Sequence, residues 1–131
     1  IILFSSKING IYNTTSGYET SNLINEIENG YVGGGTALYK AIIEGLNILN
    51  QESDNYTKTI IAMTDGIINI GNYNELSSYY KKLNKEIPVY SITFGSASET
   101  ELKKIAKLTN AKVFDGKTSL LNAFKEVRGY N

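Results

Sequence analysis

The stretch TIIAMTDG, residues 59–66, decides the fold class. Thr59 to Met63 is an apolar run bounded by polar residues, which is typical of a parallel strand buried on both faces. Thr64-Asp65-Gly66 follows directly and ends the run. We therefore predict a buried strand that carries a carboxylate at its tip.

Further elements are predicted on the C-terminal side of this run and directly before it. Val89 to Phe94 and Val113 to Phe114 are apolar strand candidates. Apolar residues at helical spacing mark four helices, with inward positions at Leu38, Ala41, Ile42, Gly45, Leu46 and Leu49; Leu76, Tyr79, Tyr80 and Leu83; Leu102, Ile105 and Ala106; and Leu120, Leu121, Phe124 and Val127. From about residue 36, helices and strands alternate. This order predicts an α/β fold, a three-layer, doubly wound, mostly parallel sheet.

Helix starts are predicted from polar residues that precede the apolar stripes. Asn72 with Glu75, and Ser98 with Glu101, have the spacing of capping boxes. Thr118 is expected to cap the last helix.

The first thirty residues are less regular. Ile1 to Phe4 predicts a strand, and Asn9-Gly10 is a turn signal that favours a short hairpin or edge strand near Ile11 to Asn13. Leu23, Ile24 and Ile27 predict a short amphipathic helix that ends at Asn29-Gly30. Because the chain begins inside a predicted strand, we expect it to be a piece of a longer protein.

Composition excludes several classes of function. The 131 residues suit one domain, 1–131, with 41% hydrophobic residues and a formal net charge of zero. Without a basic surplus, nucleic acid is not an expected partner. The chain has no cysteine and no histidine, so thiolate metal sites and Ser-His-Asp triads are excluded.

Two motifs are expected at the carboxyl ends of strands, where ligands of open α/β sheets gather. Gly33-Gly34-Gly35-Thr36 leads into a helix, and Thr64-Asp65-Gly66 follows a strand. Hydroxyl and carboxylate oxygens suit a hard cation such as Mg²⁺, Mn²⁺ or Ca²⁺. Taken singly, the first motif is also compatible with a plain helix cap and the second with a plain turn. The dinucleotide and P-loop signatures are absent. Asp54 and Asp115 are interpreted as loop residues.

These motifs resemble those of von Willebrand factor A domains, over nearly the whole chain. Residues 34–39, GGTALY, resemble the second metal-site motif of that family, and residues 60–66, IIAMTDG, resemble the third. Residues 88–95, PVYSITFG, resemble the following strand. The resemblance implies a metal-ion-dependent adhesion site in which Thr36 coordinates the ion, Asp65 acts through a water, and a partner's carboxylate completes the coordination. The family's first motif, Asp-x-Ser-x-Ser, is absent, so only a partial site is expected.

The resemblance also implies that the family's first strand and helix are missing. That strand would lie between the strand at Ile1 to Phe4 and the strand at Thr59 to Met63. An empty slot would leave its neighbours roughly 10 Å apart, too far for hydrogen bonds. We therefore expect the slot to close directly or to be filled from another chain, and we expect self-association through unpaired sheet edges.

Three functions follow as hypotheses. The first is a non-enzymatic, protein-binding adhesion module. The second is an accessory subunit of an ATP-driven chelatase or transport assembly. The third, a hydrolase or phosphotransferase using Asp65, lacks a second acid, base or nucleophile. The segments at 113–117 and 127–131 resemble the ends of bacterial proteins that join a solute-binding-like domain to a von Willebrand factor A domain. This resemblance implies an extracytoplasmic or membrane-anchored protein.

Overall fold

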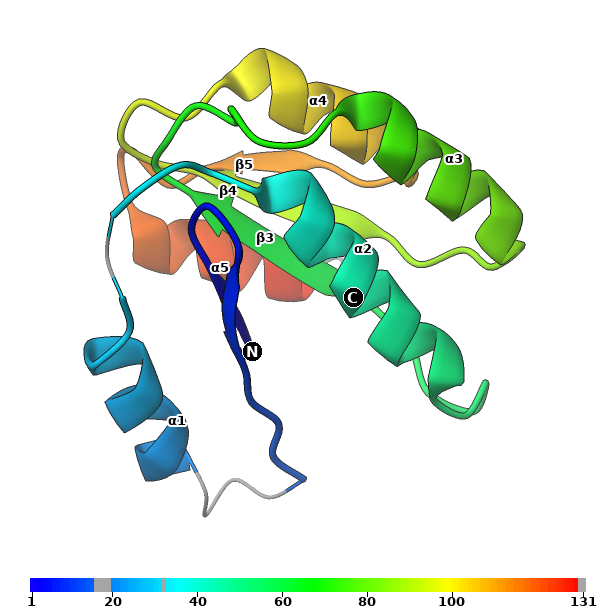
Figure 1. The fold of residues 1–131 in the computed structure, drawn as a ribbon, viewed down its shortest axis with the longest axis horizontal. Coiled ribbons are helices and arrows are strands. Elements are labelled where there is room, and N and C mark those ends of the chain that lie inside the picture. Colours follow the sequence, from blue (N-terminus) through cyan, green and yellow to red (C-terminus); the bar gives the residue numbers. More distant parts are fainter. Residues whose placement is uncertain (16–19, 32, 130–131) are drawn as a thin grey trace.

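The computed structural model describes residues 1–15, 20–31 and 33–129, which form a mixed α/β fold (Figure 1). In chain order the elements are β1 (Ile2–Phe4), β2 (Ile8–Ile11), α1 (Thr20–Glu28), α2 (Leu38–Gln51), β3 (Ile60–Thr64), α3 (Tyr73–Leu83), β4 (Val89–Thr93), α4 (Glu99–Leu108), β5 (Val113–Asp115) and α5 (Leu120–Gly129). From α2 onward the predicted alternation of helices and strands is confirmed.

The centre of the fold is a parallel three-stranded sheet in the order β3-β4-β5. Ile60 is in register with Val89, and Ser91 is in register with Val113. All five residues of β4 are buried, because this strand has a neighbour on each side and helices over both faces. The predicted bounds of the three strands agree with the structure to within one residue.

Side chains of the sheet alternate between two helical layers. Val89 belongs to a core cluster shared with α2, α3 and α4, whereas Tyr90 and Ile92 pack with Ala123 and Val127 of α5. In Figure 1, α5 lies on one side of the sheet, and α2, α3 and α4 lie on the other. The predicted three-layer arrangement is therefore confirmed for this part of the chain.

Helix α2 connects the sheet to the N-terminal part of the chain. A Cβ placed at Gly45 would lie 3.1 Å from Cδ1 of Ile60 in β3 and 3.6 Å from Cδ1 of Ile2 in β1. Glycine at this position lets the helix approach both strands closely. Side chains of the two strands therefore converge beneath α2, although the strands belong to different sheets.

Strands β1 and β2 form an antiparallel hairpin of their own, with Leu3 opposite Gly10. The prediction of a turn at Asn9-Gly10 was wrong, since both residues lie within β2. The turn comes earlier because Ser5 N donates to Lys7 O over 2.8 Å, and Asn9 Nδ2 donates to Ser5 Oγ over 3.0 Å. These bonds close the chain at residues 5–7 and leave the Asn-Gly pair in the returning strand.

The slot expected between β1 and β3 is not closed by direct pairing. Among the described residues, β1 pairs with β2 and β3 pairs with β4, and no ladder joins the two sheets. Direct closure was therefore wrong, because β1 meets its backbone partners within its own hairpin. Filling by another chain and self-association through sheet edges both stay predictions.

Helix α5 faces the sheet with fewer residues than predicted. Ala123 and Val127 are buried, but Leu120, Leu121 and Phe124 are 39%, 66% and 38% exposed. The prediction that all of Leu120, Leu121, Phe124 and Val127 face inward was thus wrong except at Val127. The reason is that α5 packs on β4 and β5 and leaves the same face of β3 largely uncovered. Ile61, whose register partner Tyr90 points to this face, is 41% exposed.

The predicted short helix before Asn29-Gly30 is confirmed as α1. Its Ile24 and Ile27 are 47% and 50% exposed.

Within the described ranges, no helix is both long and apolar enough to cross a membrane.

The helix caps only partly follow the predictions. Asn72 caps α3 as expected, because its side chain accepts a hydrogen bond from Glu75 N over 3.0 Å. Ser98 occupies the N-cap position of α4 but makes no side-chain cap bond. Its predicted partner Glu101 instead accepts a hydrogen bond from the Tyr39 hydroxyl and forms an ion pair with Lys104.

The predicted cap of α5 was also displaced. Thr118 donates its hydroxyl to Asp115 over 3.1 Å, and Ser119 Oγ accepts from Asn122 N over 3.3 Å. The role predicted for Thr118 therefore belongs to the next residue.

Candidate functional site

Thr36 lies at the carboxyl-end rim of the sheet, next to the turn that follows β3. Helix α2 begins at Leu38, and its N-cap residue is Ala37, which makes no side-chain cap bond. Thr36 is therefore not the helix cap that its sequence position also allowed. Its Oγ1 lies 2.9 Å from the point where a Cβ at Gly66 would be. The hydroxyl thus faces the Thr64–Gly66 turn, and only a glycine at 66 leaves this space open.

Asp65 lies at the same rim, fixed by its backbone. Its carbonyl oxygen accepts hydrogen bonds from Ser96 N over 2.9 Å and from Ser96 Oγ over 3.0 Å. Gly95, with φ of 55°, passes so close that a Cβ there would be 3.0 Å from the Cβ of Asp65. The side chain of Asp65 is exposed, and in the described part of the chain its carboxylate has no hydrogen-bond or ion-pair partner.

The turn itself is stabilised by Thr64. This residue is buried, and its Oγ1 accepts a hydrogen bond from Gly66 N over 3.3 Å. The plain-turn interpretation of Thr64-Asp65-Gly66 is therefore correct for Thr64, whereas the carboxylate of Asp65 is not used by the turn.

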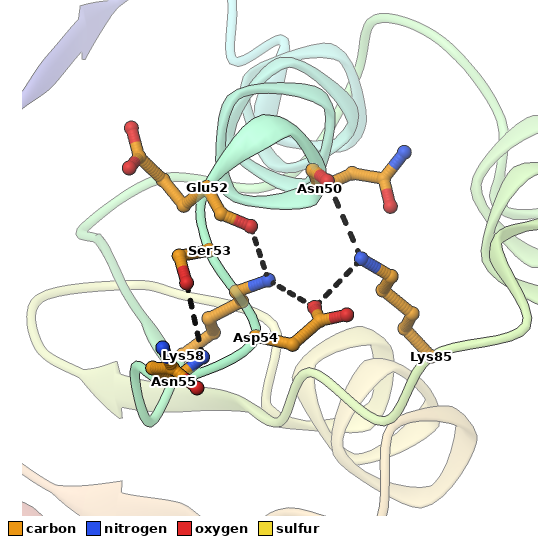
Figure 2. A network of polar contacts seen from close by, with 7 residues as sticks. All are labelled: Asn50, Glu52, Ser53, Asp54, Asn55, Lys58 and Lys85. Carbon is orange, nitrogen blue, oxygen red and sulfur yellow. Dashed lines mark hydrogen bonds and ion pairs between the residues drawn. The ribbon is translucent and has the colours of Figure 1, made fainter.

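The other two aspartates are engaged in other contacts. Asp54 lies in a loop as predicted, whereas Asp115 is the last residue of β5 and not a loop residue. Asp115 accepts from Lys117 N over 2.8 Å and from Thr118, which closes the turn after β5. Asp54 lies at the opposite, amino-terminal end of the sheet, between Lys58 at 2.9 Å and Lys85 at 2.8 Å (Figure 2). Hydrogen bonds from Lys85 and Lys58 lower the pKa of Asp54 from 3.8 to about 2.

The Asp54 network joins two loops at that end. Lys58 Nζ also donates to the Glu52 carbonyl over 2.8 Å, and Lys85 Nζ donates to the Asn50 carbonyl over 3.4 Å (Figure 2). Both lysines reach back to the end of α2. The network therefore ties the chain before β3 and the chain before β4 to the same helix end.

The oxygens of Thr36 and Asp65 suit a hard cation that keeps several waters, as Mg²⁺ commonly does. Both are free of protein partners within the described ranges, and neither is a soft ligand. In residues 1–15, 20–31 and 33–129, no group of three or more His, Cys, Asp or Glu side chains gathers as a metal cage. The two oxygens thus fit only a shared site, in which they would supply part of the coordination and water or a partner the rest.

Three further residues at this rim were not predicted from the sequence. Ser6 Oγ accepts from Gly35 N over 2.6 Å, and Asn69 Oδ1 accepts from Thr36 N over 2.8 Å. Ser96 bonds to the Asp65 carbonyl. The position of Ser6 directly after the first predicted strand was a usable signal, because ligand-binding residues of open α/β sheets follow the carboxyl ends of strands. No comparable signal marked Asn69.

A parallel sheet with helices on both faces defines an α/β domain, and ligands of open sheets of this kind gather at the carboxyl-end rim. The chain belongs to the von Willebrand factor type A domain family, whose sequence model matches residues 1–127. Members of this family commonly mediate protein interactions. No curated protein matches the chain. The narrower resemblance to bacterial proteins with a solute-binding-like domain stays a prediction, and residues 130 and 131 of that segment lie outside the described residues.

Proposed function

We propose that this domain is a non-catalytic module that binds a protein partner at the carboxyl-end rim through a divalent cation. Thr36 would bind the ion through Oγ1, and Asp65 would act directly or through a water. A carboxylate of the partner would complete the coordination. The cation would thereby convert two weak oxygen ligands into a site that recognises negative charge.

The observation that carries the proposal is the approach of Thr36 to the Asp65 turn. Thr36 Oγ1 lies 2.9 Å from the Cβ position at Gly66, so residues 30 positions apart in the sequence meet at one rim. Neither the Thr36 hydroxyl nor the Asp65 carboxylate has a structural partner among the described residues. Exposed polar groups held by a rigid scaffold and not used by it are candidates for binding.

The test is a titration of the chain with Mn²⁺, with free ion followed by electron paramagnetic resonance. Thr36→Ala and Asp65→Ala should each weaken Mn²⁺ binding by roughly tenfold or more. Asp54→Ala is the matched control, because it removes an aspartate from the opposite end of the sheet and should leave the affinity unchanged. Equal affinity of Asp65→Ala and the unaltered chain would refute the proposal.

A further inference from the structure

The loop that carries Thr36 is hydrogen-bonded from two sides by segments distant in sequence. From the hairpin side, Ser5 O accepts from Ala37 N over 2.8 Å and Ser6 Oγ accepts from Gly35 N over 2.6 Å. From the β3–α3 side, Asn69 Oδ1 accepts from Thr36 N over 2.8 Å. Three consecutive amides, at residues 35, 36 and 37, thus each donate to a different long-range acceptor.

Asn69 forms hydrogen bonds with both backbone polar groups of Thr36, the N–H and the C=O. While its side chain accepts from Thr36 N, its own amide donates to Thr36 O over 3.4 Å, as does the amide of Ile70. Such paired bonds fix the peptide planes before and after Thr36. Since the Cα–Cβ direction follows from the backbone, they also fix the Thr36 Cβ from which Oγ1 reaches toward Gly66.

Asn69 also occupies the space beside the neighbouring glycine. A Cβ at Gly35 would be 2.7 Å from Asn69 Oδ1 and 2.6 Å from Ile70 Cδ1. The side chain of Asn69 therefore lies directly against the loop. It approaches the backbone of residues 35 and 36 and contributes no atom to the space between Thr36 Oγ1 and Gly66.

We infer that Asn69 is a positioning residue for the Thr36 ligand, with Ser6 supporting the same loop from the hairpin side. The inference rests on the proposed function and deepens it. A neutral amide supplies a strong acceptor here without placing a second negative charge beside the Asp65 turn. Asn69 acts through Thr36 and is not itself a ligand of the ion.

The experiment compares Asn69→Ala with Asn72→Ala. Asn72 is a matched control, because its Oδ1 accepts from the backbone amide of Glu75 over 3.0 Å in the same way, but this bond caps α3 and does not hold the Thr36 loop. The first readout is amide hydrogen exchange at Thr36, which reports local opening of that bond. We expect Asn69→Ala to raise exchange at Thr36 about tenfold, as loss of one hydrogen bond implies, while Asn72→Ala leaves it unchanged.

The second readout is Mn²⁺ affinity in the same variants. Asn69→Ala should weaken Mn²⁺ binding by about tenfold, the usual effect of removing a group that orients a ligand, and Asn72→Ala should not. Asn69→Asp keeps the acceptor and should restore slow exchange at Thr36. This rescue separates the hydrogen bond from a general loss of packing at position 69.

The outcomes distinguish the positioning role of Asn69 from the proposed cation-dependent binding. Unchanged exchange or unchanged Mn²⁺ affinity in Asn69→Ala, while Thr36→Ala loses the ion, would overturn the positioning role and leave the proposed function standing. Absence of Mn²⁺ binding by the unaltered chain would refute the proposed function. Exchange at Thr36 would in that case still decide whether Asn69 fixes the loop.

Discussion

The two ends of the three-stranded sheet each present an aspartate in a loop beside β3, and the two side chains are in opposite situations. Asp54, at the amino end, is held by Lys58 and Lys85, and its pKa is lowered to about 2. Asp65, at the carboxyl end, is fixed through its carbonyl oxygen while its carboxylate has no protein partner in the described ranges. Asp54 thus uses its charge to connect loops at the amino end, whereas Asp65 keeps its charge available at the carboxyl end.

The largest effect on stability is expected from alanine substitution of Gly95, which lies beside Asp65. Gly71, which lies away from Asp65, serves as the comparison. Gly95 and Gly71 both have positive φ, 55° and 83°, so alanine is strained at either position. Only at Gly95 would the new Cβ press on Asp65, at 3.0 Å from its Cβ; at Gly71 the nearest atom is 3.8 Å away. Gly95→Ala should cost about 2–3 kcal/mol of unfolding free energy and Gly71→Ala about 1 kcal/mol.

Urea unfolding and Mn²⁺ titration of both glycine variants check this difference. Gly95→Ala should also weaken Mn²⁺ binding, because it displaces Asp65, and Gly71→Ala should not. Similar Mn²⁺ affinities in the two variants would contradict the assignment of the carboxyl end to binding.

A pair of buried threonines gives the next largest effect. At the amino end, Thr109 Oγ1 accepts from Val89 N over 3.1 Å and donates to Ile105 O over 3.0 Å, fully buried. At the carboxyl end, Thr64 Oγ1 accepts from the half-buried Gly66 N. Thr109→Val should cost about 2 kcal/mol, because it leaves a buried amide unpaired, and Thr64→Val about 1 kcal/mol.

For Mn²⁺ affinity the order should be reversed, so that Thr64→Val loses more affinity than Thr109→Val. Thr64→Val loosens the turn that presents Asp65, so its Mn²⁺ affinity should fall despite the smaller loss of stability. Thr109→Val should bind Mn²⁺ normally, as judged by the same titration at a temperature where both variants are folded. A larger loss of Mn²⁺ affinity in Thr109→Val, the less stable variant, would contradict the assignment of binding to the carboxyl end.

The smallest effect is the acid titration of Asp54. Its pKa is lower in the folded chain, about 2, than the 3.8 of the free group. A carboxyl group with a lowered folded pKa stabilises the fold above the unfolded pKa, and this contribution is lost as pH falls from about 4 through about 2. The contribution is small, because Asp54 is exposed to solvent.

Urea midpoints of the unaltered chain and Asp54→Asn measure this titration. The unaltered chain should be slightly more stable at pH 6, and the difference should disappear near pH 2. A difference that persists unchanged at pH 2 would show that the lysine pairs do not stabilise the fold through the ionised carboxylate.

Much of the fold was predictable because its signals are local. The apolar runs at β3 and β4 and the helical stripe of α2 depend on neighbouring residues, and these elements appear where expected. The turn of the hairpin was misplaced because Ser5, Lys7 and Asn9 form bonds that outweigh the Asn9-Gly10 signal. The exposure of Leu121 and Phe124 depends on which strands α5 covers, and helical spacing alone does not carry that information.

In the candidate site, too, residues with local sequence signals were predicted and residues placed by long-range contacts were not. Thr36 and Asp65 were found because the carboxyl ends of parallel strands and the helix starts that follow them share one rim. Asn69 and Ser6 were missed because their bonds span 33 and 29 residues and depend on how the loops fold over one another. Sequence reasoning therefore recognised the candidate ligands but not the residues that hold them in place.

One edge of β3 has no strand partner among residues 1–15, 20–31 and 33–129, and this edge bears on the behaviour of the polypeptide before and after it folds. Its five residues, Ile60 to Thr64, include no charge and no proline, the usual devices by which proteins prevent unwanted strand pairing. A short, uncharged, β-prone segment of this kind favours aggregation when molecules are crowded, as during synthesis at high level. Shielding of this strand, by a chaperone early or by a binding partner later, would then determine how much of the protein remains in solution.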